Sequence, residues 1–156
     1  MMAQPRATFR VLGVDPGLNV TGYAAVDFAP GAVEPAIVEA GCIQTDPRGR
    51  MGPRIAQLHA DLAALLAELR PGQVAVEKLY AHYKHPRTAI LMAHARGVIL
   101  LAAQQAGVAV ADLPATQVKK ALTGNGHASK QQVQRAVQAA CRLARLPEPP
   151  DVADAL

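Results

Sequence analysis

Four acidic residues stand where a carboxylate is costly without a partner. Asp15 ends one apolar run of the chain and Glu77 ends another, while Asp151 and Asp154 lie together near the last residue. Apolar runs of this kind form buried strands, where an ionised carboxylate is unfavourable unless it is paired or binds a cation. Carboxylates without Cys or His are typical ligands of Mg²⁺ and Mn²⁺ and disfavour zinc. The four acids therefore predict a site for a hard divalent metal ion, assembled from distant segments.

Each acid also has a structural explanation when it is taken alone. Asp15 begins an Asp-Pro-Gly sequence, which is a common turn. Glu77 could end a strand and face solvent. Asp151 and Asp154 are spaced to share one helix face, and acids in a first helical turn complement the helix dipole. The metal hypothesis therefore depends on whether the rest of the chain brings the four together.

The N-terminal part of the chain predicts three antiparallel strands. Residues 9–14 form a buried apolar run that Asp15-Pro16-Gly17 breaks with turn residues. Two further strands are expected over 21–28 and 36–43. The intervals between them are too short for helical crossovers and favour hairpins.

A helix and two more strands are expected next. Apolar residues recur at helical spacing over 51–70, and Pro71-Gly72 ends this helix. They are Ile55, Leu58, Leu62, Leu65, Leu66 and Leu69. Residues 73–77 and 108–113 then predict the fourth and fifth strands.

The segment 88–106 predicts a helix that is apolar on nearly every side. Its large apolar residues are Ile90, Leu91, Met92, Val98, Ile99, Leu100 and Leu101. A helix with apolar side chains all round is buried on more than one side. We expect the domain core on one side and a second subunit on the other.

The C-terminal part predicts three helices. A short one is expected over 115–122. Ser129 with Gln132 three residues later forms a capping box for the next, which should extend to about Leu143. A proline-rich connection then sets up a final helix at Asp151.

Charge distribution points to a polyanionic partner. The chain has 156 residues, enough for one ordinary domain, and a formal charge of +4. Residues 78–147 hold ten Lys and Arg side chains and one acid, Asp112. Solvated surfaces usually mix signs, so this block favours nucleic acid, with a merely soluble basic surface as the alternative.

Nothing in the sequence indicates a membrane or secreted protein. No stretch reaches the ~18 apolar residues of a membrane helix, and the first ten residues lack an apolar signal core. Two cysteines, Cys42 and Cys141, are too few for a disulfide framework and are interpreted as buried apolar residues. We expect a soluble protein of the reducing cytoplasm.

The order of these elements, with acids on the first and fourth strands and on the last helix, is that of the ribonuclease H superfamily. Several segments closely resemble the RuvC-type Holliday junction resolvases. They are Leu12-Gly13-Val14-Asp15-Pro16-Gly17, Thr21-Gly22-Tyr23, Ala75-Val76-Glu77-Lys78, Ala95-Arg96-Gly97-Val98, Gln117-Val118-Lys119 and Asp151-Val152-Ala153-Asp154-Ala155-Leu156. The resemblance implies an α/β ribonuclease H-like fold, with a five-stranded mixed sheet flanked by helices, in one nuclease domain over 1–156. Because such enzymes continue past the last acid, we expect the C-terminal helix to be truncated.

The resemblance also implies a reaction. Asp15, Glu77, Asp151 and Asp154 would hold two Mg²⁺ or Mn²⁺ ions for phosphodiester hydrolysis, which leaves 5′-phosphate ends. Lys119 and Lys130 align with basic residues that resolvases place near the scissile phosphate, although solvated lysines are the alternative. The substrate would be a four-way DNA junction, cut by paired symmetric nicks in recombination and repair. A homodimer would supply two equivalent sites, and other members act with a branch-migration motor complex.

A tyrosine-bearing segment is the candidate for contacts with unpaired bases. Two of the three tyrosines, Tyr80 and Tyr83, lie three residues apart among basic residues, as base stacking requires. Tyr80 matches the aromatic residue that resolvases place beside the junction centre, and loop-anchoring tyrosines are the alternative. The expected DNA-binding residues are Tyr80, Tyr83, Lys84, Arg87, Lys119, Lys120 and Lys130.

Three other functions compete with junction resolution. A related ribonuclease H-like nuclease that processes ribosomal RNA would share Asp15 and the fold, but the tyrosine segment and the apolar helix argue against it. A non-catalytic junction-binding module has no need of four acids. An ATP-binding kinase or actin-like domain would need a second lobe, for which the chain is too short.

Overall fold

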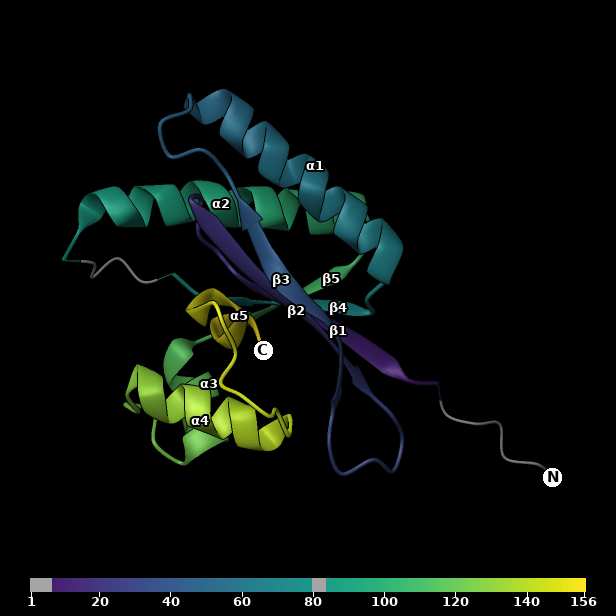
Figure 1. Ribbon diagram of the computed structural model, residues 1–156. Coiled ribbons are helices and arrows are strands. Elements are labelled where there is room, and N and C mark those ends of the chain that lie inside the picture. The colour runs from purple at the N-terminus through teal and green to yellow at the C-terminus, as the bar shows by residue number, and fades with distance from the viewer. Residues whose placement is uncertain (1–6, 80–83) are drawn as a thin grey trace.

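The computed structural model describes residues 7–79 and 84–156, which form one mixed sheet with helices on both faces (Figure 1). The strands are β1 (Phe9–Asp15), β2 (Val20–Phe28), β3 (Ala36–Gln44), β4 (Gln73–Glu77) and β5 (Ala109–Leu113). Their order is β3-β2-β1-β4-β5. The pairs β1–β2 and β2–β3 are antiparallel, while β4 runs parallel to both β1 and β5. The predicted ribonuclease H-like sheet is therefore confirmed.

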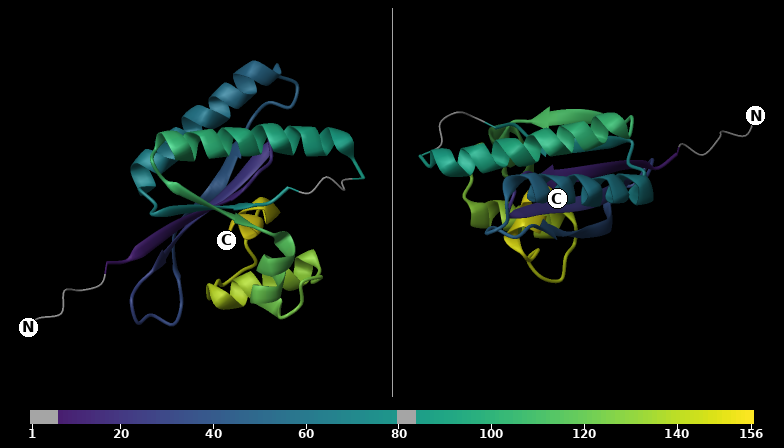
Figure 2. Two further views of the ribbon diagram at one scale, coloured as in Figure 1. Left: turned by 180° about the vertical axis from the view of Figure 1, so that it is seen from behind. Right: turned by 90° about the horizontal axis from the view of Figure 1, so that it is seen from above.

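The five helices divide between the two faces of the sheet. On one face lie α1 (Met51–Leu69) and α2 (Pro86–Gln105), and on the other lies α5 (Pro150–Ala155), with α3 (Ala115–Thr123) and α4 (Lys130–Ala140) beyond it (Figure 2). The short α5 crosses β1 and β2 and contacts both. This division leaves the ends of the central strands between the two groups of helices.

The hydrophobic core lies between the sheet and the α1–α2 layer. Its buried members include Leu12, Val14, Leu58, Leu62, Val74, Val76 and Ile99. The apolar stripe of α1 faces this core as its helical spacing predicts, while β1 and β4 are central strands. The core therefore holds the ends of β1 and β4 in place, and these ends carry Asp15 and Glu77.

Two boundaries differ from the sequence prediction by more than one residue. Helix α2 begins two residues earlier than expected, because Pro86 occupies its first turn, where a missing N–H costs nothing. Helix α4 starts at the predicted capping box but ends at Ala140 and not near Leu143. The cause is Arg142, which adopts a left-handed conformation with φ 49°. Gly and Asn are the residues that usually adopt this conformation at a helix end, so an arginine gives no signal in the sequence that α4 ends here.

The two cysteines are less buried than predicted. Cys42 and Cys141 are free thiols with partly exposed side chains, so their interpretation as buried apolar residues is wrong. Among the described residues, no helix combines the length and apolar content needed to cross a bilayer.

Helix α2 buries one face and leaves apolar side chains on another. Ala95, Ile99, Ala102 and Ala103 are buried against the core. Ile90 and Leu101 remain 58% and 50% exposed. The predicted burial of one side against the core is thus confirmed, and the other apolar side is exposed in the described chain. The predicted second subunit on that side stays a prediction.

Replacement of Leu58 by Ala should lower the free energy of unfolding by about 2–5 kcal/mol, since it leaves a cavity under the sheet. Leu58 is fully buried in the core, whereas Val33 is 98% exposed in the β2–β3 connection. Val33→Ala is the control and should change stability by less than about 0.5 kcal/mol. Urea unfolding followed by circular dichroism measures both. Equal effects of the two variants would contradict the assignment of the core.

Candidate active site

Two of the four predicted acids meet because β1 and β4 are parallel neighbours. Asp15 is the last residue of β1 and Glu77 is the last residue of β4. The register pairs Val14 with Val76, so both carboxylates leave the sheet at the same edge, one residue further on. Parallel strands bring their carboxyl ends together, and this topology is what makes the two distant acids neighbours.

Helix α5 brings the other two acids to the same place. It lies so close to β1 and β2 that a Cβ atom added at Gly13 would collide with the Ala155 carbonyl, and one at Gly22 with the Asp151 backbone. The two glycines are therefore the contact surface that admits α5. The sequence shows both glycines within the family-like segments, but only the fold reveals this role.

The pKa of Asp15 responds to the charges of the other three acids. The pKa of Asp15 is raised to about 7, first by burial at the end of β1 and next by the negative charge of Asp154. Glu77 and Asp151 act on the pKa of Asp15 in the same direction, while Lys130 lowers it. Asp15 is thus the centre of a carboxylate cluster that consists of Asp15, Glu77, Asp151 and Asp154.

Two predicted lysines lie at this carboxylate cluster. Lys130 Nζ lies 3.2 Å from Asp154 Oδ2 in an ion pair. Burial raises the pKa of Glu77, as does the charge of Asp154, whereas Lys119 lowers it and is therefore close enough to compensate part of the negative charge. Lys119 comes from α3 and Lys130 from the start of α4, so both helices deliver a cation to the acids.

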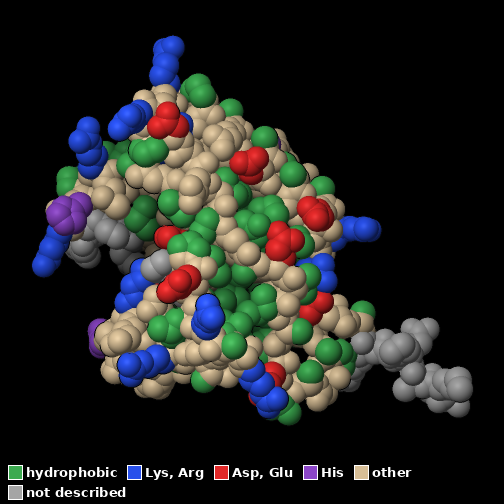
Figure 3. Space-filling view, in the orientation of Figure 1, with side chains coloured by type: hydrophobic (Ala, Val, Ile, Leu, Met, Phe, Trp, Pro, Cys, Tyr) green, Lys and Arg blue, Asp and Glu red, His purple; other side chains and the backbone are tan. Residues whose placement is uncertain are grey.

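The other predicted DNA-binding residues are either exposed on the surface or outside the described part of the chain. Lys84, Arg87 and Lys120 have exposed side chains. Tyr80 and Tyr83 lie outside the described residues. In the view of Figure 3, most of the Lys and Arg side chains lie toward one side of the molecule, with others at its opposite and lower edges.

The donor chemistry of the cluster fits a hard divalent cation. All four side chains offer carboxylate oxygens, and their mutual repulsion would be relieved by a dication. Within residues 7–79 and 84–156, however, no three acidic, His or Cys side chains are already arranged to hold a metal. The acids therefore share one region without forming a complete cage, and the Lys130 ion pair already engages Asp154.

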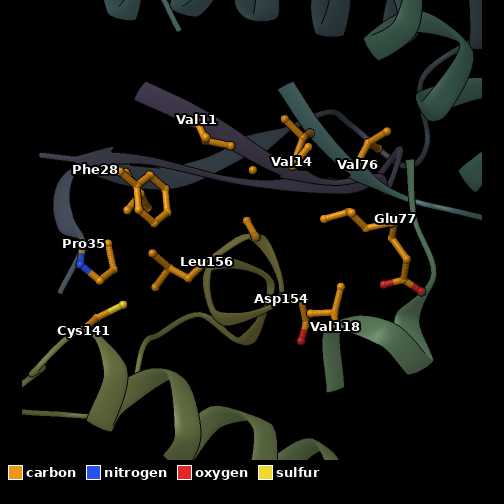
Figure 4. Close-up of a pocket in the computed structure, with 15 residues that line it drawn as sticks. Val11, Val14, Phe28, Pro35, Val76, Glu77, Val118, Cys141, Asp154 and Leu156 are labelled. Atoms are coloured by element: carbon orange, nitrogen blue, oxygen red, sulfur yellow. The ribbon is translucent and has the colours of Figure 1, made fainter. Parts of the chain in front are cut away.

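An apolar pocket of about 250 Å³ opens beside the cluster. Figure 4 shows Glu77 and Asp154 at one end of it, next to Val118, with Phe28, Pro35 and Leu156 at the other. The apolar walls reduce the water around Glu77, which is consistent with its raised pKa.

Two further residues at the cluster were not singled out by the sequence. Arg96 on α2 donates to the Glu77 carbonyl oxygen at 3.4 Å and pairs with Asp112, so it ties α2 to β4 and β5. Burial raises the pKa of Cys42, and the charges of Asp151 and Asp15 add to it, which places this thiol beside the acids. Arg96 belongs to a family-like segment, while nothing in the sequence marks Cys42.

Comparison with known proteins decides between the candidate functions. Residues 11–156 match the family described as "Crossover junction endodeoxyribonuclease RuvC". The chain belongs to this family. It is 45% identical over 154 residues to the RuvC of Rhodopirellula baltica, which covers 99% of this chain and 85% of that protein. The family assignment excludes an ATP-binding domain and disfavours a separate ribosomal-RNA nuclease.

Solved structures agree with the assignment. The Thermus thermophilus RuvC in complex with a Holliday junction substrate has a TM-score of 0.86 and 34% identity, covering 94% of this chain and 88% of that one. The yeast mitochondrial Holliday junction resolvase has a TM-score of 0.66 at 13% identity, covering 98% and 78%. The second similarity concerns the fold alone.

The raised pKa of Asp15 predicts a pH-dependent stability. Its pKa in the folded chain, about 7, lies above the ordinary value of 3.8. The folded state therefore holds the Asp15 proton more tightly, and this stabilisation is complete below about pH 4 and lost as the pH rises through about 7. In EDTA, the wild-type chain should lose stability relative to Asp15→Asn over this range. Thermal unfolding of both proteins from about pH 4 to about pH 8 measures it, and parallel curves would contradict the burial of Asp15 among acids.

Proposed function

We propose that this chain cuts four-way DNA junctions with the carboxylate cluster, as a metal-dependent endonuclease of recombination and repair. The observation that carries the proposal is the convergence of Asp15, Glu77, Asp151 and Asp154 on the buried end of β1, in a chain of the RuvC family. Paired symmetric nicks, each leaving a 5′-phosphate, would resolve the junction into two duplexes.

The cluster would hold two Mg²⁺ or Mn²⁺ ions. Bound ions of this kind activate a water molecule and stabilise charge on the leaving oxygen. Asp15 and Glu77 are fixed by the core strands and would set the position of the site. Asp151 and Asp154 are held by α5, which rests on Gly13 and Gly22.

Lys119 and Lys130 would compensate charge at the scissile phosphate. Each already acts electrostatically on an acid of the cluster, Lys119 on Glu77 and Lys130 on both Asp154 and Asp15. An incoming phosphate adds negative charge at this point, and two fixed cations lower the energy of that charge in a partly buried site.

The DNA would extend from the cluster over the basic surface. Lys84, Arg87 and Lys120 are exposed cations that would contact backbone phosphates. Tyr80 and Tyr83 remain the proposed stacking residues for unpaired bases at the junction centre, on the argument from their sequence.

The exposed face of α2 would form a homodimer. Ile90, His94, Gly97 and Leu101 follow one another at helical spacing and are all exposed. No atom lies within 4 Å of a Cβ position at Gly97, so a second helix could approach closely there. A two-fold dimer would present two equivalent clusters to a junction with two-fold symmetry. Family membership also supports a branch-migration motor complex as a partner, in the cytoplasm.

The test of function compares a labelled four-way junction with a matched linear duplex, in EDTA, Mg²⁺ or Mn²⁺. Wild-type protein should nick the junction in symmetric pairs only when metal is added. Asp15→Asn should bind the junction as well as wild type and lose cutting, because it removes a charge that a metal would need. A denaturing gel reports cutting and a gel shift reports binding.

Two outcomes would contradict this assignment. Cutting by Asp15→Asn at the wild-type rate would remove Asp15 from the metal site. Wild-type cutting of the duplex and of the junction at equal rates would remove the junction from the proposed function.

Leu101→Glu should convert dimers into monomers, since it places a charge in the exposed apolar face of α2. Val33→Glu introduces the same charge at a site that is more exposed and lies away from α2, and it should leave the dimer intact. Sedimentation velocity distinguishes the two states. A persistent Leu101→Glu dimer would move the interface to another surface.

A further inference from the structure

The start of α1 carries positive charge where a helix favours negative charge. Arg48 and Arg50 are exposed in the loop before the helix, and Arg54 lies in its first turn. This first turn contains no acidic residue. The N-terminal end of a helix is itself positive, so acids stabilise it and bases do not. Helix stability therefore does not explain three arginines at this position.

Arg54 is the most unusual of the three. Its side chain is 6% exposed and bonds only to neutral groups: Nε donates to Thr45 Oγ1 at 3.0 Å and Nη2 to Asn19 Oδ1 at 2.5 Å. In the part of the chain that the structure describes, no carboxylate lies within ion-pair distance of it. A buried charge is costly unless another charge compensates it. Arg54 therefore adds a fixed positive charge at this end of α1 that no acid of the described residues offsets.

The backbone at this end of α1 is open to an anion. Arg50 is the N-cap and makes no side-chain cap hydrogen bond, so it leaves the first N–H groups of the helix without that partner. Gly52 is exposed, and no atom lies within 4 Å of the position that a Cβ would occupy there. Glycine destabilises a helix, and packing does not require it here. It does leave room for a phosphate oxygen to approach the N–H groups of Met51 and Gly52, whereas Pro53 has no N–H and the Arg54 N–H bonds to the Arg50 carbonyl oxygen.

This region lies at the same end of the sheet as the carboxylate cluster. Asn19, which Arg54 contacts, belongs to the short connection that follows Asp15. Thr45 also donates to the Leu18 carbonyl oxygen at 2.6 Å and so joins the loop to that connection. Helix α1 covers the face of the sheet opposite to α3 and α4 (Figures 1 and 2). The arginines therefore extend the basic surface to the other side of the cluster.

We propose that residues 48–54 form a second phosphate-binding site, in which Arg48, Arg50 and the N–H groups of Met51 and Gly52 bind the backbone of a duplex arm. Arg54 would add positive charge from behind this site. The inference rests on the proposed function, since the arm belongs to the junction held at the cluster. The contact is to phosphate and so does not depend on base sequence. It would fix the direction in which this arm leaves the cluster.

The deciding variant is Gly52→Glu, because it affects helix stability and phosphate binding in different ways. An acid in the first turn complements the helix dipole and replaces a glycine, so thermal stability should rise or stay unchanged. The same acid repels a phosphate, so affinity for a synthetic four-way junction should fall several-fold. Ala64→Glu makes the same change of charge at an exposed position in the middle of α1 and should bind as wild type does. Binding is measured in EDTA, where no cutting occurs.

A second pair of variants tests the arginines. Arg48→Gln/Arg50→Gln should reduce the slope of log affinity against log salt by about 0.9 for each phosphate that these side chains neutralise in the wild-type complex. Arg70→Gln, at the opposite end of α1, should leave the slope unchanged. The second site would be overturned if Gly52→Glu and the double variant both bound the junction with the affinity and the salt slope of the wild-type protein. Absence of junction preference in the wild-type protein would instead overturn the proposed function, so the two failures are distinct.

Discussion

Repulsion among four carboxylates at the buried end of β1 is the constraint around which this fold is arranged. Burial and three neighbouring acids raise the pKa of Asp15 to about 7, so ionisation of this carboxyl group is unfavourable in the folded chain. Lys130 and Lys119 offset part of the negative charge. Repulsion among these acids destabilises the folded state. A cation bound by the four carboxylates would offset this cost and would account for the arrangement.

The mixed sheet explains how this charge is concentrated. Parallel pairing of β1 with β4 places Asp15 and Glu77 at one edge, while the antiparallel hairpins leave the surface of β1 and β2 free for α5. Two glycines, Gly13 and Gly22, let that helix come close enough to deliver Asp151 and Asp154. On the opposite face, the α1–α2 layer supplies the core that keeps these strands rigid. The two faces thus have different tasks, stability on one and assembly of the cluster on the other.

Local patterns in the sequence predicted most of the fold, because strands and helices space their apolar residues periodically. The five strands, the α1 stripe and the Ser129 capping box all correspond to such local patterns. The end of α4 does not, since a left-handed Arg142 has no characteristic residue type. The exposure of Cys42 also depends on tertiary packing that no local pattern contains.

The site was predictable in its acids and less so in its supporting residues. An acid at the end of an apolar run is conspicuous, whereas Arg96 and Arg54 are ordinary arginines until the fold shows their partners. Arg96 reaches the Glu77 carbonyl oxygen from α2, and Arg54 is buried among neutral groups. Both act through contacts between segments that are distant in the sequence, and a single sequence does not reveal such contacts.

The most direct test of this account is a crystal structure of the protein soaked in Mn²⁺, with anomalous diffraction measured to locate the ions. The account predicts anomalous peaks between Asp15, Glu77 and the acids of α5, with Asp154 released from Lys130 to bind metal. Manganese bound only elsewhere, with the Lys130–Asp154 pair intact, would contradict the claim that the carboxylate cluster is a metal site.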